Sequence, residues 1–138
     1  MPQLDWNPLE FLECLNVTPN FDEEYETFYQ YILVQGDLRL VMTVFQYEQV
    51  VELFLEGVAT GATVFRCALF VRGAVKFIND KRGKYLEFQN CAIGANRFWY
   101  QTAPNVLDTE IFPYGQTLQL EMEPEMRIVF ESNRYRYD

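Results

Sequence analysis

Hydrophobic and polar residues alternate along several segments of the chain, which is typical of strands with one buried face. The clearest segment places Leu38, Leu40, Met42 and Val44 on one face and Arg39, Val41, Thr43 and Phe45 on the other. Thr63 to Val71 alternates in the same way. Ala74 to Ile78 and Lys84 to Phe88 flank a polar loop that ends in Gly83, a pattern that predicts a hairpin.

Further strands are predicted where short apolar or aromatic runs lie between turn residues. They cover Thr27 to Gln35, Arg97 to Thr102, Thr117 to Glu123 and Glu125 to Glu131. Residues 48–56 leave two alternatives open. Val51, Leu53 and Leu55 alternate as in a strand, whereas Val50, Val51, Phe54 and Leu55 also fit helical spacing with Gly57 as a cap.

A short helix is predicted from Pro8 to Leu15. Asn7 is a favourable N-cap, Pro8 suits the first helical position and Glu10 stands three residues after the cap. Asn16 can end the helix.

These elements predict a mainly β fold, an antiparallel β-sandwich or partly closed barrel of about eight or nine strands with a short N-terminal helix. The 138 residues suit one domain. Within it we expect a helical N-terminal segment (1–20), a β core (27–131) and a polar tail (132–138).

The composition excludes several kinds of chemistry. The sequence contains no histidine, so Ser-His and Cys-His nucleophiles and His-ligated metals are excluded. Cys14, Cys67 and Cys91 lie far apart without a CxxC motif, which favours buried, inert thiols in a reducing compartment. No segment has the pattern of a secretory signal or a membrane span, and we expect a cytoplasmic protein without a cofactor.

The charge is distributed unevenly. The net charge of the chain is −9. Residues 1–60 have a net charge of −10, and residues 61–138 have a net charge of +1. An acidic half favours cationic partners and disfavours nucleic acid and anionic membranes. The densest acidic cluster, Asp22, Glu23, Glu24 and Glu26, is therefore one candidate binding site, although an acidic surface also serves solubility.

A second candidate binding surface combines arginine with aromatic residues. Arg, Trp and Tyr are the residue types that dominate binding hot spots. The candidates are Arg97, Trp99 and Tyr100, together with Arg134 and Tyr135. The alternative is that these rings fill the core beneath arginine stems.

Carboxylates are the one plentiful reactive group. Glu121 and Glu123 fall on one face of a predicted strand, and two carboxylates at this spacing can act as an acid/base pair. That face lies opposite Leu118, Leu120 and Met122, so the expectation is a solvated outer face. No motif supports catalysis or a metal site.

The sequence thus favours a non-catalytic module that binds another protein, and the acidic half favours a basic partner. An acidic small protein can neutralise a basic one by electrostatically steered association, as immunity proteins do with nuclease toxins. No motif links the chain to such a family. A small-ligand-binding barrel or sandwich is the alternative, since 17% of the residues are aromatic. A carboxylate enzyme is the third hypothesis, and a homodimer is compatible with all three.

Overall fold

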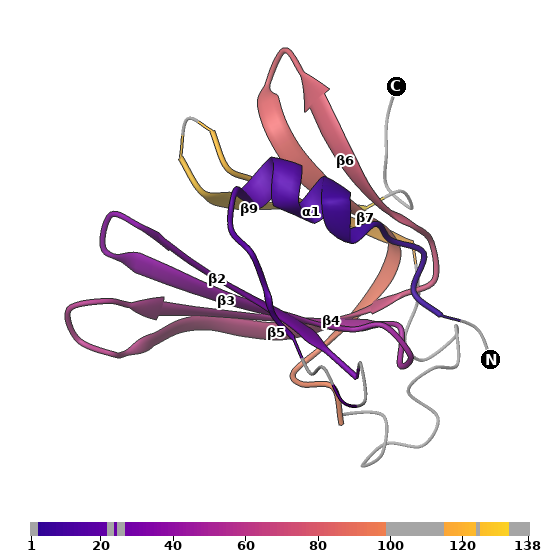
Figure 1. The fold of residues 1–138 in the computed structure, drawn as a ribbon, viewed down its shortest axis with the longest axis horizontal. Coiled ribbons are helices and arrows are strands. Elements are labelled where there is room, and N and C mark those ends of the chain that lie inside the picture. Colours follow the sequence, from indigo (N-terminus) through magenta and orange to yellow (C-terminus); the bar gives the residue numbers. More distant parts are fainter. Residues whose placement is uncertain (1–2, 22–23, 25–26, 99–114, 124, 133–138) are drawn as a thin grey trace.

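The computed structural model describes residues 3–21, 24, 27–98, 115–123 and 125–132. In this part of the chain one helix precedes nine strands (Figure 1). They are α1 (Pro8–Leu15), β1 (Asn20–Phe21), β2 (Tyr29–Gln35), β3 (Leu38–Phe45), β4 (Val50–Gly57), β5 (Thr63–Val71), β6 (Val75–Asp80), β7 (Gly83–Gly94), β8 (Gln116–Glu121) and β9 (Arg127–Ser132).

The strands form one antiparallel sheet that bends into two layers. The order is β1-β2-β3-β4-β5-β7-β8-β9, and β6 pairs with the first half of β7. The last residues of β7, Cys91 to Gly94, pair instead with β5, after an irregularity between Phe88 and Cys91. The strand β7 therefore joins a layer of β1–β5 to a layer of β6–β9, and the sheet stays open (Figure 1). This confirms the predicted mainly β fold with a short N-terminal helix.

The core lies between the two layers. Leu40, Met42 and Val44 are fully buried, as the alternation in β3 predicts. Phe11 of α1 extends the core, because its ring centroid lies 5.4 Å from that of Tyr31 on β2 and 6.4 Å from that of Phe88 on β7. The helix thus fills the space between the layers on the side where the sheet does not close.

The helix begins and ends where the sequence predicts. The side chain of Asn7 accepts a hydrogen bond from the Leu9 N–H, and Asn16 ends the helix with a left-handed backbone. Glu10 Oε1 accepts a hydrogen bond from the Phe77 N–H over 2.9 Å. The helix is therefore tied to β6 by a side chain as well as by the core.

The structure settles two of the sequence predictions. Residues Val50–Gly57 form a strand rather than a helix, because β4 pairs with β3 on one side and β5 on the other. The strand predicted from Arg97 is wrong at its start. Arg97 and Phe98 lie in a turn, in which the Asn96 side chain accepts a hydrogen bond from the Phe98 N–H over 2.9 Å. The rest of that segment, 99–102, lies outside the described residues.

Candidate binding groove

The outward face of β2–β4 carries two adjoining hollows of about 610 and 250 Å³, which share Thr43 and Glu52. We call the two together the outer groove. Its lining includes Gln30, Thr43, Phe45, Glu52, Phe54 and Arg97. The groove has the size of sites that hold a ligand or several side chains of a partner.

A row of polar side chains crosses the middle of the outer groove. The register pairs Gln30 with Thr43 and Thr43 with Glu52, so the three residues lie side by side on β2, β3 and β4. Gln30 Nε2 donates a hydrogen bond to Thr43 Oγ1 over 3.3 Å. Glu52 is half-buried, and its carboxylate has no hydrogen bond or ion pair with any described residue. A partly desolvated carboxylate without a counter-charge favours the approach of a cation.

Arg97 closes one end of the outer groove. Its guanidinium lies 4.0 Å from the centroid of the Phe45 ring and 4.3 Å from that of Phe98. Its Nη1 also lies 3.5 Å from Glu48 Oε1 in an ion pair. The stacking and the ion pair hold the side chain in place while 26% of it stays exposed. A held arginine beside aromatic rings is a common feature of interface hot spots.

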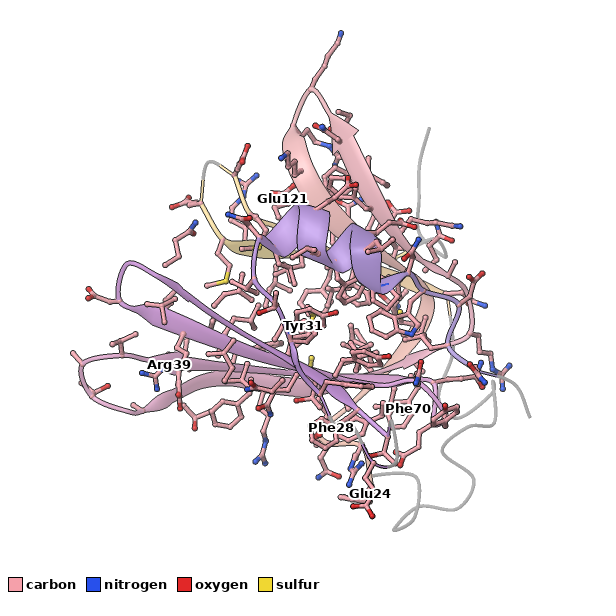
Figure 2. The ribbon with its side chains drawn as sticks, viewed as in Figure 1. Glu24, Phe28, Tyr31, Arg39, Phe70 and Glu121 are labelled. Carbon is pink, nitrogen blue, oxygen red and sulfur yellow. The ribbon has the colours of Figure 1, made fainter. Side chains whose placement is uncertain are left out.

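The opposite end of this layer combines an ion pair with exposed aliphatic side chains. Arg39 Nη1 lies 2.8 Å from Glu56 Oε1. On β2, Ile32 and Val34 are 42% and 59% exposed. In Figure 2, Arg39 lies toward one end of the layer and Phe28 and Glu24 toward the other. Apolar and charged groups together, as on this face, are typical of protein interfaces.

Two of the residues predicted for binding lie in the described part of the chain. Arg97 lines the outer groove, and Glu24 is exposed near Phe28, another lining residue (Figure 2). The remaining predicted residues lie outside the described part and are Asp22, Glu23, Glu26, Trp99, Tyr100, Arg134 and Tyr135.

Sequence reasoning missed Glu52, Thr43 and Phe45 as candidate site residues. Thr43 and Phe45 on β3 and Glu52 on β4 occupy outward positions of alternating strands, so the alternation predicts that their side chains point away from the core. The pattern does not show that strand register brings Thr43 and Glu52 together, nor that the turn after β7 brings Arg97 onto Phe45.

The thiols are buried, as predicted. Cys14, Cys67 and Cys91 are free cysteines at no more than 6% exposure. Burial raises the pKa of each thiol to about 12. A thiol with such a pKa is a poor nucleophile at neutral pH.

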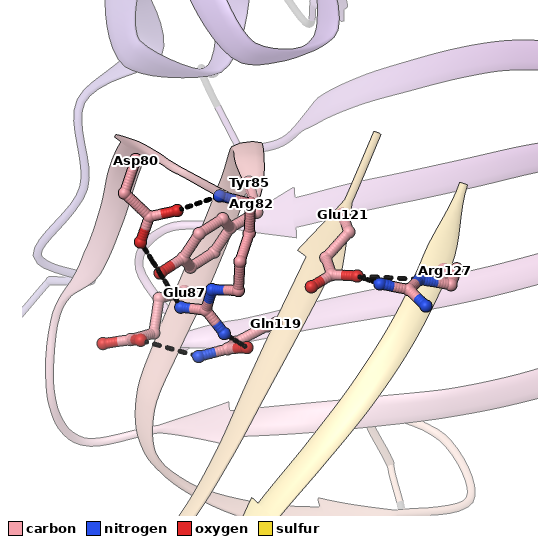
Figure 3. Close-up of polar contacts among 7 residues, drawn as sticks. All are labelled: Asp80, Arg82, Tyr85, Glu87, Gln119, Glu121 and Arg127. Carbon is pink, nitrogen blue, oxygen red and sulfur yellow. Dashed lines mark hydrogen bonds and ion pairs between the residues drawn. The ribbon is translucent and has the colours of Figure 1, made fainter. Parts of the chain in front are cut away.

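The prediction that the polar face of β8 is exposed to solvent is wrong for Glu121. Glu121 is 3% exposed, because Arg127 of β9 covers its carboxylate and donates from Nε over 2.8 Å (Figure 3). Glu123 is exposed. The two carboxylates therefore do not share one environment, and the structure gives no support to an acid/base pair there. Among the described residues, no three Asp, Glu or Cys side chains are placed to hold a metal ion.

The fold and the site define the class of protein. It is a mainly β protein whose open antiparallel sheet forms two layers and carries the outer groove on the outward face of one layer. The described helix, α1, is too short to cross a bilayer. No family model matches the chain, and no curated protein matches it. Among solved structures, the chain is similar to one in the contact-dependent growth inhibition toxin–immunity protein complex from Klebsiella pneumoniae 342. The TM-score is 0.67 at 12% identity, over 96% of this chain and 99% of that chain. This likeness establishes a shared fold.

Proposed function

We propose that the protein is a non-catalytic, immunity-like module that binds a basic protein partner through the outer groove. The observation that carries the proposal is Glu52, a half-buried carboxylate in the middle of a groove bordered by exposed aliphatic side chains. Arg66 and Arg97 line the same groove, but Glu52 forms no ion pair with either of them. A lysine or arginine of a partner would complete this site with a charge-assisted hydrogen bond.

The similar structure supports a protein partner, because its fold occurs in a complex of a toxin with an immunity protein. The chemistry of this chain favours the binding role over the toxic one. The sequence has no histidine, and burial keeps the three thiols protonated at neutral pH.

The charge of the chain supports a basic partner. Residues 1–60, which carry a net charge of −10, include the whole of β3 and β4. A negative field accelerates association with a cationic protein, and salt weakens this effect. We therefore expect binding to be faster at low ionic strength.

The test compares charge reversals at two carboxylates. The protein and its Glu52→Lys and Glu13→Lys variants are used to capture proteins from a lysate of the source organism, and one captured basic protein is then purified. Binding of that protein is measured by biolayer interferometry at low and high salt. Glu13 lies exposed on α1, so its reversal changes the net charge equally without touching the groove.

We expect Glu52→Lys to weaken binding by about tenfold or more, since it replaces one attraction by a repulsion. Glu13→Lys should alter only the association rate, and slightly. Equal affinities for the wild type and Glu52→Lys would refute the assignment of the groove. Failure to capture any protein at near-stoichiometric amount would argue against the function itself.

Small-ligand binding is the second candidate function, and one observation favours it. A hollow of about 220 Å³ between the two layers is lined by apolar side chains, Leu55, Phe65, Met126, Ile128 and Phe130. Native mass spectrometry of the purified protein tests this function. A bound mass that is lost on denaturation would support it, and a bare polypeptide mass would oppose it.

A further inference from the structure

The outward face of β7–β9 carries a second hollow, of about 600 Å³, which shares no lining residue with the outer groove. We call it the polar hollow. The lining residues that determine its chemistry are Arg82, Glu87, Thr117, Gln119 and Glu131. It lies on the layer opposite to the one that carries the outer groove, so the two sites are physically separate.

A chain of hydrogen bonds fixes the floor of the polar hollow (Figure 3). Arg82 lies over the Tyr85 ring at 4.5 Å from its centroid, and its Nη1 donates to Gln119 Oε1 over 3.2 Å. Gln119 Nε2 donates in turn to Glu87 Oε2 over 3.0 Å. Gln119 is 4% exposed. Because these partners hold one another, a ligand would meet a rigid floor and bind with little further ordering.

The positive charge of Arg82 is already neutralised. Arg82 Nη2 lies 3.5 Å from Asp80 Oδ2, and Tyr85 donates from its hydroxyl to the same oxygen over 3.0 Å. The backbone N–H of Arg82 also binds Asp80, and this bond is the main reason why the pKa of Asp80 is lowered. Asp80 thus stays ionised, and Arg82 does not turn the hollow into an anion site.

Two side chains that line the polar hollow without a partner among the described residues, Thr117 and Glu131, can accept hydrogen bonds, and the exposed amide of Asn90 lines it as well. Thr117 is 6% exposed, and its hydroxyl lines the hollow without a hydrogen-bond partner in the described segments. Glu131, its register partner on β9, is half-buried and also has no ion pair or hydrogen bond there. The hydroxyl of this nine-tenths buried residue, beside a carboxylate that forms no ion pair with a described residue, can accept a hydrogen bond from a donor that enters the hollow.

Glu87 adds a second negative charge without a cation in contact. Its two carboxylate oxygens accept from the neutral amides of Gln119 and Gln89, each over 3.0 Å. Lys76 faces Glu87 in the register of β6 and β7, but it is exposed and forms no ion pair with it. The polar hollow therefore holds two carboxylates whose charges are not balanced by contacts.

We propose that the polar hollow binds a cationic group with several N–H donors, a guanidinium or an alkylammonium. Glu131 and Glu87 supply the charge, and Thr117 Oγ1 accepts a further hydrogen bond. A planar guanidinium or a terminal ammonium matches this set of acceptors, whereas an anion would meet two carboxylates. The same chemistry is offered by a free polyamine and by an arginine side chain of a protein, and the experiment separates these sources.

The test titrates the full chain at low salt with L-argininamide, with spermidine and with the peptide acetyl-Gly-Arg-Gly-amide, followed by two-dimensional ¹H–¹⁵N NMR. Glu131→Gln and Thr117→Val are compared with Glu13→Gln, which removes an exposed carboxylate on α1. Circular dichroism checks that each variant is folded, and Thr117→Ser, which keeps the hydroxyl, accompanies Thr117→Val.

We expect saturable shifts of the Thr117 and Gln119 amides, weakened about tenfold by Glu131→Gln and about threefold by Thr117→Val. Glu13→Gln should leave the affinity unchanged, and Thr117→Ser, which keeps the hydroxyl, should bind more tightly than Thr117→Val. Tighter binding of the peptide than of spermidine identifies an arginine side chain as the source, and the reverse order identifies a polyamine. Shifts that do not saturate, or equal losses in Glu131→Gln and Glu13→Gln, would overturn the proposal. These outcomes do not depend on Glu52, so they are distinct from the test of the outer groove.

Discussion

Alkaline pH should unfold this protein earlier than an ordinary β domain, because three thiols are buried in its core. Cys14, Cys67 and Cys91 are 6%, 4% and 0% exposed. Burial raises the pKa of each from 9.0 to about 12 in the folded chain. The unfolded chain binds fewer protons than the folded chain between these two values, so the free energy of unfolding must fall as pH rises through this window.

The magnitude follows from the size of the window. Each pH unit above the unfolded pKa lowers the free energy of unfolding by about 1.4 kcal/mol per thiol. At pH 10 the three thiols together remove about 4 kcal/mol, which is a large share of the 5–15 kcal/mol of a typical domain. The full contribution is present below about pH 8, where the thiols are protonated in both states.

Urea unfolding followed by circular dichroism at pH 7.5, 8.5, 9.5 and 10 measures this loss under reducing conditions. The midpoint should fall with increasing slope above pH 9. In Cys91→Ala the fall between pH 8.5 and pH 10 should shrink by about a third, because one of three thiols is gone. The loss of stability caused by the void in Cys91→Ala is the same at pH 8.5 and at pH 10. It therefore cancels when the two stabilities of this variant are subtracted. A midpoint that stays constant to pH 10, or a fall of equal size in Cys91→Ala, would refute the reasoning.

Substitutions at three positions test the packing and the helix cap. Tyr31→Phe removes a buried hydroxyl that has no hydrogen-bond partner among the described residues, and we expect about 1 kcal/mol more stability in urea unfolding. Asn7→Ala removes the acceptor for the Leu9 N–H and should lower stability by about 1 kcal/mol, whereas Asn7→Asp should not. Gly73→Ala would bring a Cβ within 2.6 Å of the Gln89 carbonyl oxygen, so thermal unfolding should show a loss of about 1–3 kcal/mol.

Local patterns account for most of the fold. The cap at Asn7 and the proline at the first helical position act within one turn, so the bounds of α1 agree with the prediction. Alternation gives the buried face of β3 because the period of two depends on neighbouring residues alone. The strand predicted at Lys84 to Phe88 was too short, however. The strand β7 runs on to Gly94, because its last four residues pair with β5, and this pairing depends on residues about 20 positions earlier.

The candidate sites were harder to predict, since each joins residues that are distant in sequence. Arg97 was chosen for its residue type, and the structure does place it in the outer groove. Its partners there, Phe45 and Glu48, come from β3 and the turn after it, and no local signal connects them. Glu121 was expected in water on a polar face. Its burial depends on Arg127, which reaches it from the adjacent strand.

The separation of core and outward faces makes the two binding proposals testable without unfolding the protein. Stability comes mainly from the inward residues of both layers and from Phe11 of α1. Glu52 and Glu131 point away from this core and have no hydrogen-bond or ion-pair partner among the residues described. Replacing either carboxylate by an amide therefore breaks no described contact. Because the substitution also removes a partly desolvated charge, the free energy of unfolding should stay the same or rise slightly. A binding loss in Glu52→Gln or Glu131→Gln at unchanged stability would then report recognition itself.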